Sequence, residues 1–245
     1  MNIDDLQIVV LEDLKDHWDD PDVRALYADL MKMKFDGYGS VYGSNVISSD
    51  KADFFGTHLM VCQKGLRLKP LFGYKSVTLD KCREFHLKFP ALSLVGNDGH
   101  YECLNELNEI IDKAENRGER VSFDYSWAQT PDIKKIRSKE MTELFRDLVM
   151  TLVIHHHQDY GIEHMITCGV VKVKTDIFFE RLGLNKISAY SKFSQKDLNE
   201  EMVHIFHNNR YSDYAYKVAE KYHFLWKNRL TLSKKQTLTA VREAA

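Results

Sequence analysis

The segment Phe178-Phe179-Glu180-Arg181-Leu182-Gly183-Leu184 closes the stretch that decides the fold, residues 137 to 184. After Ser138, a possible N-cap, apolar residues recur at helical spacing as far as Gly161, which suits the left-handed end of a helix. Gly183 ends a second, shorter helical pattern in the same way. The stretch therefore predicts a helix over 138–160, a strand over 162–173 and a helix over 175–182, and a strand over 186–193 is predicted to follow it.

Upstream of this stretch the pattern changes between helical and strand-like spacing. Asp20 precedes Pro21, and an acidic cap before a proline begins a helix, here with an apolar stripe that ends near Asp36. The glycines over 37–43 predict a mobile loop. Lys64-Gly65 predicts a turn between two strands, which should pair antiparallel because their connection is short. The periodicity predicts strands over 57–63, 66–72, 75–79 and 120–127, a loop over 89–99 and a helix over 103–116.

Downstream, Ser194 stands three residues before Asp197, as in a capping box. This spacing predicts a helix to Asn208, and a second helical pattern runs over 212–228. The expected organisation is one domain over 1–193, with the helices of 194–245 packed on the same domain.

Composition limits the class of protein. The chain has 245 residues, of which 44% are hydrophobic and 29% charged, enough for a sizeable core and an ordinary surface. Its formal net charge of −2 gives no positive field for nucleic acid, and its four cysteines form no Cys-x-x-Cys pair for a zinc ribbon. The N-terminus lacks the basic and apolar regions of a signal peptide, and no apolar run reaches the ~18 residues of a membrane span. We therefore expect a cytoplasmic protein without a membrane span.

The order of these elements is similar to that of the GNAT acyltransferase superfamily. The segment Phe178–Leu184 resembles the late motif of that family, an aromatic pair, an acidic and a basic residue, then Leu-Gly and an apolar residue. The resemblance implies an α/β fold with a mixed, mostly antiparallel, twisted sheet flanked by helices, here with a C-terminal helical extension. It also implies an acyl-CoA or acyl carrier protein thioester as co-substrate, and no metal.

A second match lies at the start of the predicted long helix. Residues 135–142 look like a degenerate version of the family's pyrophosphate-binding loop, in which backbone N–H groups at a helix N-terminus bind phosphate oxygens. The resemblance implies that the cofactor contacts Lys134, Lys135, Arg137, Ser138 and Lys139, together with the aromatic pair Phe178 and Phe179.

Two positions depart from the family pattern. Glu140 stands where the loop usually has glycine, and its carboxylate repels a pyrophosphate unless it points away or pairs with a basic residue. Many family members protonate the leaving thiolate with a tyrosine in the aromatic pair, whereas this chain has Phe178 and Phe179. Either a tyrosine from elsewhere or water serves here, or the acid step has been lost.

The N-terminal half resembles the autoinducer (acyl-homoserine-lactone) synthases and the long-chain N-acyl amino acid synthases within this superfamily. Lys34-Phe35, the Asp50-x-x-Asp53 pair and Lys75 are similar to their Arg-x-x-Phe, Asp-x-x-Asp and following arginine. Lysine replaces arginine at both cationic positions, which weakens bidentate recognition of a carboxylate. The resemblance implies that Asp50, Asp53 and Lys75 bind the acceptor, a small-molecule amine such as an amino acid or its derivative.

Acyl transfer from a thioester to an amine needs a neutral amine, a polarised carbonyl and a protonated leaving thiol. Asp124 lies in the predicted strand over 120–127 and could accept the proton of the amine, directly or through water. Glu102 and His86 are the other candidate bases. Tyr125 and Trp127, in the same strand as Asp124, are candidate substrate contacts.

Histidines offer one alternative. Three consecutive histidines, 155–157, cannot face one ion from a helix, because successive residues point about 100° apart. His204 and His207, three residues apart in a predicted helix, could share a face and bind a metal, and His223 could join them. The preferred function is an N-acyltransferase that takes its acyl group from acyl-CoA or from a carrier protein, with a possible homodimer. The alternative is a GNAT-shaped binding or regulatory protein whose catalysis is altered.

Overall fold

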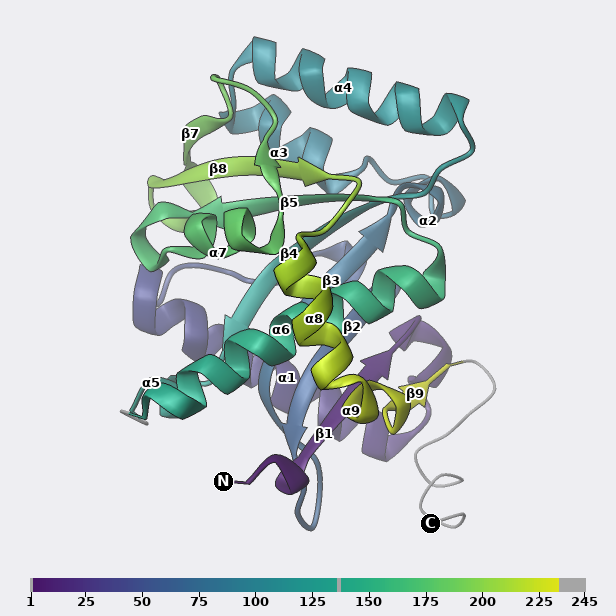
Figure 1. The fold of residues 1–245 in the computed structure, drawn as a ribbon, viewed down its shortest axis with the longest axis vertical. Coiled ribbons are helices and arrows are strands. Elements are labelled where there is room, and N and C mark those ends of the chain that lie inside the picture. The colour runs from purple at the N-terminus through teal and green to yellow at the C-terminus, as the bar shows by residue number, and fades with distance from the viewer. Residues whose placement is uncertain (1, 136–137, 234–245) are drawn as a thin grey trace. The chain divides into compact units, whose positions relative to one another are not determined.

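The computed structural model describes residues 2–135 and 138–233, with the side chains of 134 and 135 left out (Figure 1). The chain forms two compact units. Unit 1 comprises Met1–Ser76, Ser126–Phe145 and His223–Ala245, and unit 2 comprises Val77–Tyr125 and Arg146–Tyr222. Three elements continue from one unit into the other: strands β3 (Lys69–Thr78) and β4 (Val121–Gln129) and helix α6 (Lys139–Tyr160).

The sheet of unit 1 is built around strand β1 (Leu6–Leu11), which the sequence pattern missed. Strand β2 (Thr57–Gln63) pairs antiparallel with β1 on one side and with β3 on the other, with a bulge at Val61/Cys62. Strand β9 (Leu230–Leu232) pairs parallel with β1. The antiparallel pair about Lys64-Gly65 is confirmed, although the runs predicted over 66–72 and 75–79 belong to one strand, β3.

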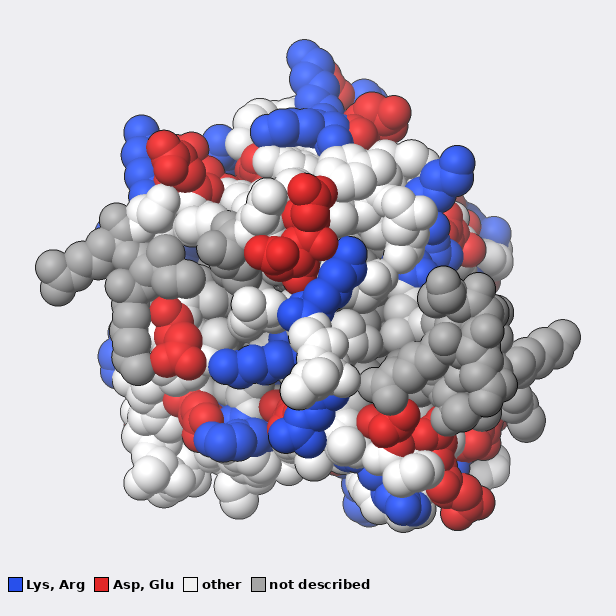
Figure 2. Space-filling model, turned by 90° about the horizontal axis from the view of Figure 1, so that it is seen from below, with Lys and Arg blue, Asp and Glu red and all other residues white. Residues whose placement is uncertain are grey.

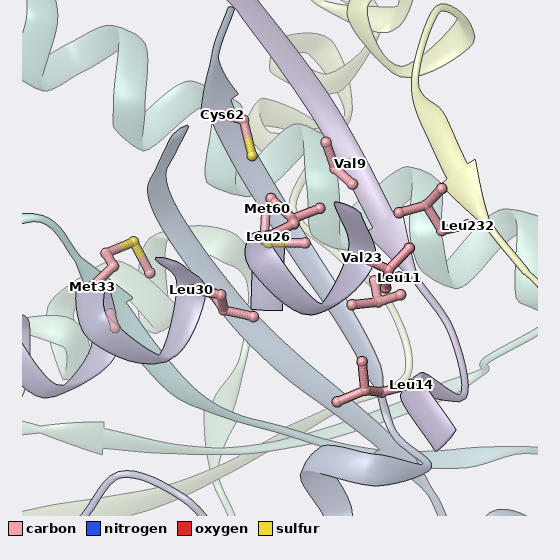
Figure 3. Packing of buried hydrophobic residues seen from close by; sticks show 11 residues of the cluster. Val9, Leu11, Leu14, Val23, Leu26, Leu30, Met33, Met60, Cys62 and Leu232 are labelled. Carbon is pink, nitrogen blue, oxygen red and sulfur yellow. The ribbon is translucent and has the colours of Figure 1, made fainter. Parts of the chain in front are cut away.

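Helix α1 (Pro21–Tyr42) covers this sheet. The Asp20 carboxylate accepts hydrogen bonds from the backbone N–H groups of Asp22 and Val23, so the predicted start is confirmed. Its apolar face packs on β1 and β2, with Leu30 of the helix and Met60 of β2 both almost fully buried (Figure 3). The core cluster of unit 1 comprises Val9, Leu11, Leu14, Val23, Leu26, Leu30, Met33, Met60, Cys62, Ala128 and Leu232.

The loop predicted over 37–43 is wrong, because α1 continues through these glycines to Tyr42. A Cβ built on Gly37 lies 2.7 Å from the backbone oxygen of Gln129, so glycine allows a close approach of the two backbones here. Unit 1 also contains helices α5 (Pro131–Lys135) and α9 (His223–Lys227) and the short 3-10 turns Ile3–Asp5, Leu14–His17 and Lys51–Phe54.

The sheet of unit 2 is built on strand β5 (His164–Val170). The part of β4 in this unit runs parallel to β5, and β8 (Glu201–Asn208) runs antiparallel to β5 on its other side. Two short strands, β6 (Asn185–Lys186) and β7 (Lys192–Gln195), pair antiparallel with β8. The helices are α2 (Leu79–Glu84), α3 (Pro90–Asp98), α4 (Tyr101–Asn116), α7 (Thr175–Leu182) and α8 (Asp213–Lys221), and 3-10 turns lie at Val171–Val173 and Lys196–Leu198.

The decisive stretch folds largely as predicted. Helix α6 begins at the Ser138 cap, since the backbone N–H of Met141 donates to Ser138 Oγ at 3.3 Å. Strand β5 and helix α7 follow, and Gly183 ends α7 with a φ of 107°. The strand predicted over 186–193 is divided into β6 and β7. The predicted α/β class with a mixed, mostly antiparallel sheet and flanking helices is confirmed.

Two other segments of unit 2 contradict the sequence analysis. The loop predicted over 89–99 is helix α3, because Pro90 occupies the first helical turn, where its missing N–H costs nothing. The helix predicted over 194–208 is largely strand β8, in which Val203 and Ile205 are buried while Met202 is exposed. This alternation has a period of two. The second predicted helix, over 212–228, is confirmed as α8 and α9.

Figure 2 shows basic side chains interspersed with acidic ones on the face that it displays. This distribution agrees with the nearly balanced charge of the sequence. None of the helices in the described part of the chain is long and apolar enough to cross a membrane.

Candidate active site

In unit 2, the parallel strands β4 and β5 pair over only part of their length. The register runs from Val121↔His164 to Asp124↔Thr167, although β5 continues to Val170 and β4 continues as well. At this last pair, Thr167 Oγ1 donates a hydrogen bond of 2.6 Å to the backbone oxygen of Asp124. The ladder therefore ends at Asp124.

The Asp124 carboxylate lies at the end of this ladder and is fully buried. Its Oδ2 lies 2.9 Å from Nε2 of His157 in α6, whose Nδ1 in turn lies 2.5 Å from the hydroxyl of Tyr211. Ser122 Oγ lies 3.5 Å from the same Nε2. Burial, followed by the charges of Asp124 and Tyr216, raises the pKa of Tyr211 well above its ordinary value. Asp124, His157 and Tyr211 thus form a hydrogen-bonded row within one unit.

The sequence pattern indicates Asp124 but neither His157 nor Tyr211. His157 was considered only within the run 155–157, as a candidate metal ligand. Neither residue has a local signal for this role. The two are 54 positions apart and meet only because α6 and the segment before α8 pack on the same sheet.

The other predicted bases, Glu102 and His86, lie on the surface of unit 2. Glu102 is exposed in the first turn of α4. His86 is exposed in a left-handed conformation with a φ of 53° just after α2. An exposed carboxylate or imidazole lacks the buried surroundings that set Asp124 apart.

In unit 1, the structure brings together the charged residues that the N-terminal resemblance selected. Asp53 Oδ1 lies 3.1 Å from Lys34 Nζ and 2.9 Å from Lys75 Nζ, and Lys75 Nζ lies 2.6 Å from Asp50 Oδ1. The backbone oxygen of Asp53 accepts a 2.8 Å hydrogen bond from Nε2 of His58. We call Lys34, Asp50, Asp53, His58 and Lys75 the charged cluster.

The charged cluster has a buried part and an exposed part. The side chains of Lys34, Asp53 and Lys75 are between 1% and 3% exposed, whereas that of Asp50 is 44% exposed. Asp50 and Asp53 also cap the turn between them, as a capping box. Among Asp50, Asp53 and Lys75, the residues predicted to bind the acceptor, Asp50 therefore reaches solvent. Asp53 and Lys75 are buried and hold the Asp50 side chain and turn in place.

The ionisation of the charged cluster follows from this arrangement. Burial by itself raises the pKa of Asp53, but Lys34, Lys75 and His58 outweigh it and leave the pKa lowered to about 2. Burial lowers the pKa of Lys34 against the attraction of Asp53. Burial also lowers the pKa of His58 to about 4, so its imidazole is neutral at pH 7. Asp53 is thus an ionised carboxylate on which the charge of the buried Lys34 depends.

Aromatic rings adjoin the charged cluster in unit 1. Tyr27 stands edge-on to His58, at 5.8 Å between ring centroids, and contacts the half-exposed rings of Trp18 and Phe54. Burial, then Asp53 and Asp50, raises the pKa of Tyr27. The charged cluster therefore lies beside a partly exposed aromatic surface.

The predicted substrate contacts Tyr125 and Trp127 are engaged in stacking within their own units. Trp127 stacks on Tyr74 at 4.0 Å between ring centroids in unit 1, and Tyr125 stacks on Phe123 at 4.6 Å in unit 2. Both residues keep partial exposure.

The predicted cofactor-binding residues fall into three groups. Arg137 and the side chains of Lys134 and Lys135 lie outside the described residues. Ser138 caps α6, and Lys139 and Glu140 are exposed in its first turn, with Lys139 Nζ 3.9 Å from Glu143. Phe178 is half-buried, whereas Phe179 is 1% exposed and packs against Phe206. Phe179 is thus part of the core of unit 2, not the wall of a ligand site.

The metal hypothesis loses its geometric basis. His204 and His207 lie on strand β8, not on a helix, and residues three apart on a strand point to opposite faces. His207 Nε2 lies 2.9 Å from Nδ1 of His164, whose Nε2 contacts Glu119 at 2.7 Å. Within the described residues, no three His, Cys, Asp or Glu side chains converge on a position for a metal ion.

The fold of this chain is similar to that of a solved acyl-homoserine lactone synthase. A CoA-dependent acyl-homoserine lactone synthase, BjaI, solved with SAM and isopentyl-CoA, aligns with a TM-score of 0.51 at 11% identity, covering 98% of each chain. The AHL synthase LasI aligns at 0.48 and 13% identity, covering 93% of this chain and 97% of that one. FeeM, an N-acyl amino acid synthase from uncultured soil microbes, aligns at 0.47 and 12%, covering 75% and 84%.

At the level of sequence, no protein-family model and no curated protein matches this chain. The structural likeness, at these low identities, establishes the fold. The chain has the GNAT fold that its late motif and the order of its elements predicted.

Proposed function

We propose that this GNAT-fold protein is an N-acyltransferase that moves an acyl group from a thioester to an amine. The observation that carries the proposal is the short parallel ladder of β4 and β5, which ends at Asp124↔Thr167 while the strands continue. Backbone groups beyond the end of such a ladder can polarise the carbonyl of a thioester that lies along the strand. A buried carboxylate, Asp124, stands at the same place to handle the proton of the amine.

Within unit 1, the charged cluster by itself suits a small molecule that carries positive charge when it binds. Asp50 offers an exposed carboxylate, fixed by Lys75 at 2.6 Å and by the backbone N–H of Ala52 at 2.8 Å. The partly exposed rings of Trp18, Tyr27 and Phe54 lie in the same unit, and aromatic faces attract cations. These features favour an amino-acid-derived amine over a neutral acceptor.

The donor is either an acyl-CoA or an acyl carrier protein. Ser138 and Lys139 at the start of α6 provide the helix N-terminus and the cation that a pyrophosphate or a phosphopantetheine phosphate requires. Both donors carry the same thioester. A titration with each of them therefore separates the two sources without altering the proposed reaction.

The first test measures binding and turnover together. Calorimetry with acyl-CoAs of increasing chain length, with CoA and with acyl carrier protein should show binding of at least one thioester. Adding a panel of amino acids and polyamines should then release free thiol and form an N-acyl amine, detected by mass. Failure to bind any thioester contradicts the proposal.

The test of the proposed base is Asp124→Asn, with Asp112→Asn as its control. Asp112 is an exposed carboxylate on α4 of the same unit. Asp124→Asn should reduce turnover by about 10²- to 10⁴-fold, the usual contribution of general acid–base groups. Asp112→Asn should leave turnover unchanged. Equal rates in the two variants would remove Asp124 from the mechanism.

A second candidate function rests on the late motif. Phe178 and Phe179 replace the tyrosine of the family pattern, and Phe179 is buried in the core. This observation favours a GNAT-shaped binding or regulatory protein without catalysis. Such a protein binds the thioester but releases no thiol with any amine, and Asp124→Asn leaves its binding unchanged. A homodimer remains a prediction, which light scattering after size exclusion can check.

A further inference from the structure

We propose that the connection between strands β2 and β3 of unit 1 binds the surface of an anionic lipid bilayer. In this proposal Leu66 inserts among the lipid headgroups, while the basic side chains on either side of it contact lipid phosphates. We call residues 64–69 the hairpin tip. The inference does not depend on the proposed acyl transfer.

The hairpin tip is held firmly at its base. The last pair of the β2–β3 ladder is Gln63↔Lys69, so the chain reverses direction within residues 64–68. The backbone N–H of Lys64 donates to the carbonyl oxygen of Asp5 at 2.8 Å, which joins the base of the tip to the 3-10 turn Ile3–Asp5. In Figure 1 the connection extends beyond this turn, at the bottom of the view. The hairpin tip is therefore a fixed protrusion of unit 1 that a flat surface can meet.

The two leucines of the hairpin tip lie in opposite environments. Leu68 packs against the core cluster of unit 1, whereas Leu66 is fully exposed. Single exposed apolar residues are common on protein surfaces, so exposure alone carries no argument. Leu66 differs from them in its place at the turn of a protruding hairpin. Since Leu68 supplies the contact with the core, Leu66 offers its whole side chain to the surface that the tip meets.

Basic residues surround Leu66. The hairpin tip contains Lys64, Arg67 and Lys69, all exposed, and no acidic residue. Each Lys or Arg close to an anionic membrane strengthens binding about fivefold. An apolar side chain among such cations is typical of an interfacial anchor, because the apolar group enters the headgroup boundary while the charges stay in the polar layer.

The acidic residues nearest to the hairpin tip leave most of its positive charge available. Lys64 Nζ donates to the backbone oxygen of Asp4 at 3.0 Å, not to a carboxylate. The Asp5 carboxylate caps the 3-10 turn that it ends. Asp29 on α1 lies 3.8 Å from Arg67 Nε in an exposed pair, and pairs of this kind contribute little. The tip therefore presents basic groups to a partner of negative charge.

A second apolar group lies beside the hairpin tip and favours lipid over an acidic protein. Lys64 lines a pocket of about 210 Å³ in unit 1 together with Ile3 and Phe224, and the ring of Phe224 is 47% exposed. Lys227, three residues after Phe224 on α9, is also exposed. Residues at this spacing are neighbours on a helix. An acidic protein would pair with the cations alone, whereas a lipid interface accepts both the cations and the apolar groups.

The test is cosedimentation of the full chain with lipid vesicles. Vesicles of equal parts phosphatidylglycerol and phosphatidylcholine should bind the wild-type protein about 100-fold more tightly than pure phosphatidylcholine, since three basic residues each contribute about fivefold. Raising the salt from about 0.1 M to about 1 M should weaken this binding, because the Debye length falls from about 10 Å to about 3 Å.

The variant that tests the apolar contact is Leu66→Asn, with Ile47→Asn as its control. Ile47 is 72% exposed in the same unit, and it precedes Asp50, whose partner Lys75 lies toward the other end of β3. Leu66→Asn should weaken binding to the anionic vesicles by about tenfold, because it removes the side chain that enters the interface. Ile47→Asn should bind as the wild type does.

The variant that tests the charge is Lys69→Gln, with Lys113→Gln as its control. Lys113 is exposed on α4 of unit 2, so the two variants have the same net charge. Lys69→Gln should weaken binding to the anionic vesicles by about fivefold. Lys113→Gln should leave it unchanged.

A gain of signal keeps the proposal testable if Leu66→Asn folds poorly. Leu66→Trp adds one fluorophore at the hairpin tip to the three tryptophans of the natural chain. The difference between its emission and that of the wild type should move to shorter wavelength when anionic vesicles are added, and acrylamide should quench it less. An unchanged difference spectrum contradicts insertion.

The remaining outcomes decide between the partners. Wild-type protein that binds anionic and neutral vesicles equally, or binds neither, overturns the proposal, as does equal binding by Leu66→Asn and Ile47→Asn. Poly-L-glutamate that displaces the vesicles and binds Leu66→Asn as well as the wild type would point to an acidic protein instead, and would also overturn it. The assay contains no thioester and no amine, so its failure leaves the proposed acyl transfer untouched.

Discussion

Replacing Asp53 by asparagine is the perturbation whose size the structure defines best. The change removes the negative charge that two buried ammonium groups share, at 3.1 Å from Lys34 and 2.9 Å from Lys75. Lowering the pKa of Asp53 from 3.8 to about 2 corresponds to about 2 kcal/mol of folding stability at 1.36 kcal/mol per pH unit. This amount is part of the about 3 to 5 kcal/mol that is typically lost when one partner of a buried ion pair is removed, here the carboxylate 3.1 Å from Lys34. We therefore expect a loss of about 3 to 5 kcal/mol.

Urea unfolding followed by tryptophan fluorescence suits this test, because Trp18, Trp127 and Trp226 all lie in unit 1 with Asp53. With a slope of about 2 to 3 kcal/mol per molar urea, the midpoint should fall by about 1 to 2.5 M. The control is Asp36→Asn, which breaks a surface pair with Lys32 and should cost less than about 0.5 kcal/mol.

A double variant refines this prediction. Adding Lys34→Met to Asp53→Asn removes the buried ammonium group that has lost its Asp53 partner, and should restore part of the lost stability. Equal midpoints for Asp53→Asn and Asp36→Asn would refute the claim that the charged cluster is a tightly coupled buried group.

Three further predictions follow from the described contacts. Gly37→Ala should destabilise unit 1, because the added Cβ lies 2.7 Å from the Gln129 carbonyl oxygen. Gly39→Ala should instead stabilise α1 by up to about 1 kcal/mol, because the nearest atom to its Cβ is Ser44 Cα at 3.9 Å. Equal melting temperatures of the two variants would contradict this. Gly183→Ala should destabilise unit 2 by more than about 1 kcal/mol, since it combines a φ of 107° with a 2.5 Å backbone clash, and unchanged hydrogen exchange in α7 and α8 would count against it. The free energy of unfolding of unit 1 should fall by up to about 3 kcal/mol as the pH is lowered from 6.5 to 4. The reason is that His58 binds a proton below pH 6.5 in the unfolded chain, but only near its lowered pKa of about 4 in the folded chain. Urea midpoints that do not change over this pH range would rule this out.

The sequence predicted the elements whose signals are local. The Asp20–Pro21 start of α1, the Ser138 cap and the Gly183 end of α7 depend on one to three neighbouring residues, and all three occur as expected. The errors arose where a distant contact overrides a local pattern. The local sequence places Gly37 in a loop, and only the close contact with the Gln129 backbone explains a glycine within the helix.

Strand β8 shows the same limit. Its residues include Glu201, His204 and His207, whose spacing also fits a helix, and the choice of strand depends on pairing with β5 and β7. Strand β1 was missed because its run is short and is stabilised by two partners far along the chain, β2 and β9. Pairing over such sequence distances leaves no local trace.

The candidate site divides in a similar way. Resemblance selected Asp50, Asp53 and Lys75 before any contact was known, and the structure joins them with Lys34 in one charged cluster. Asp124 was chosen from its place on a strand, but His157 and Tyr211 could not be found, since each needs the fold to bring it to Asp124. The exposed Glu102 and His86 had equally plausible chemistry and lacked only the burial that a sequence does not show.

The measurement that tests the central claim most directly is the mass of the product formed from an acyl thioester and an amine. The wild-type protein, incubated with acyl-CoA or acyl carrier protein and a panel of amino-acid-derived amines, should form one N-acyl amine. Its amount should equal that of the thiol released. A protein that binds these thioesters, or fails to bind them, and forms no such product with any amine contradicts the proposed acyl transfer.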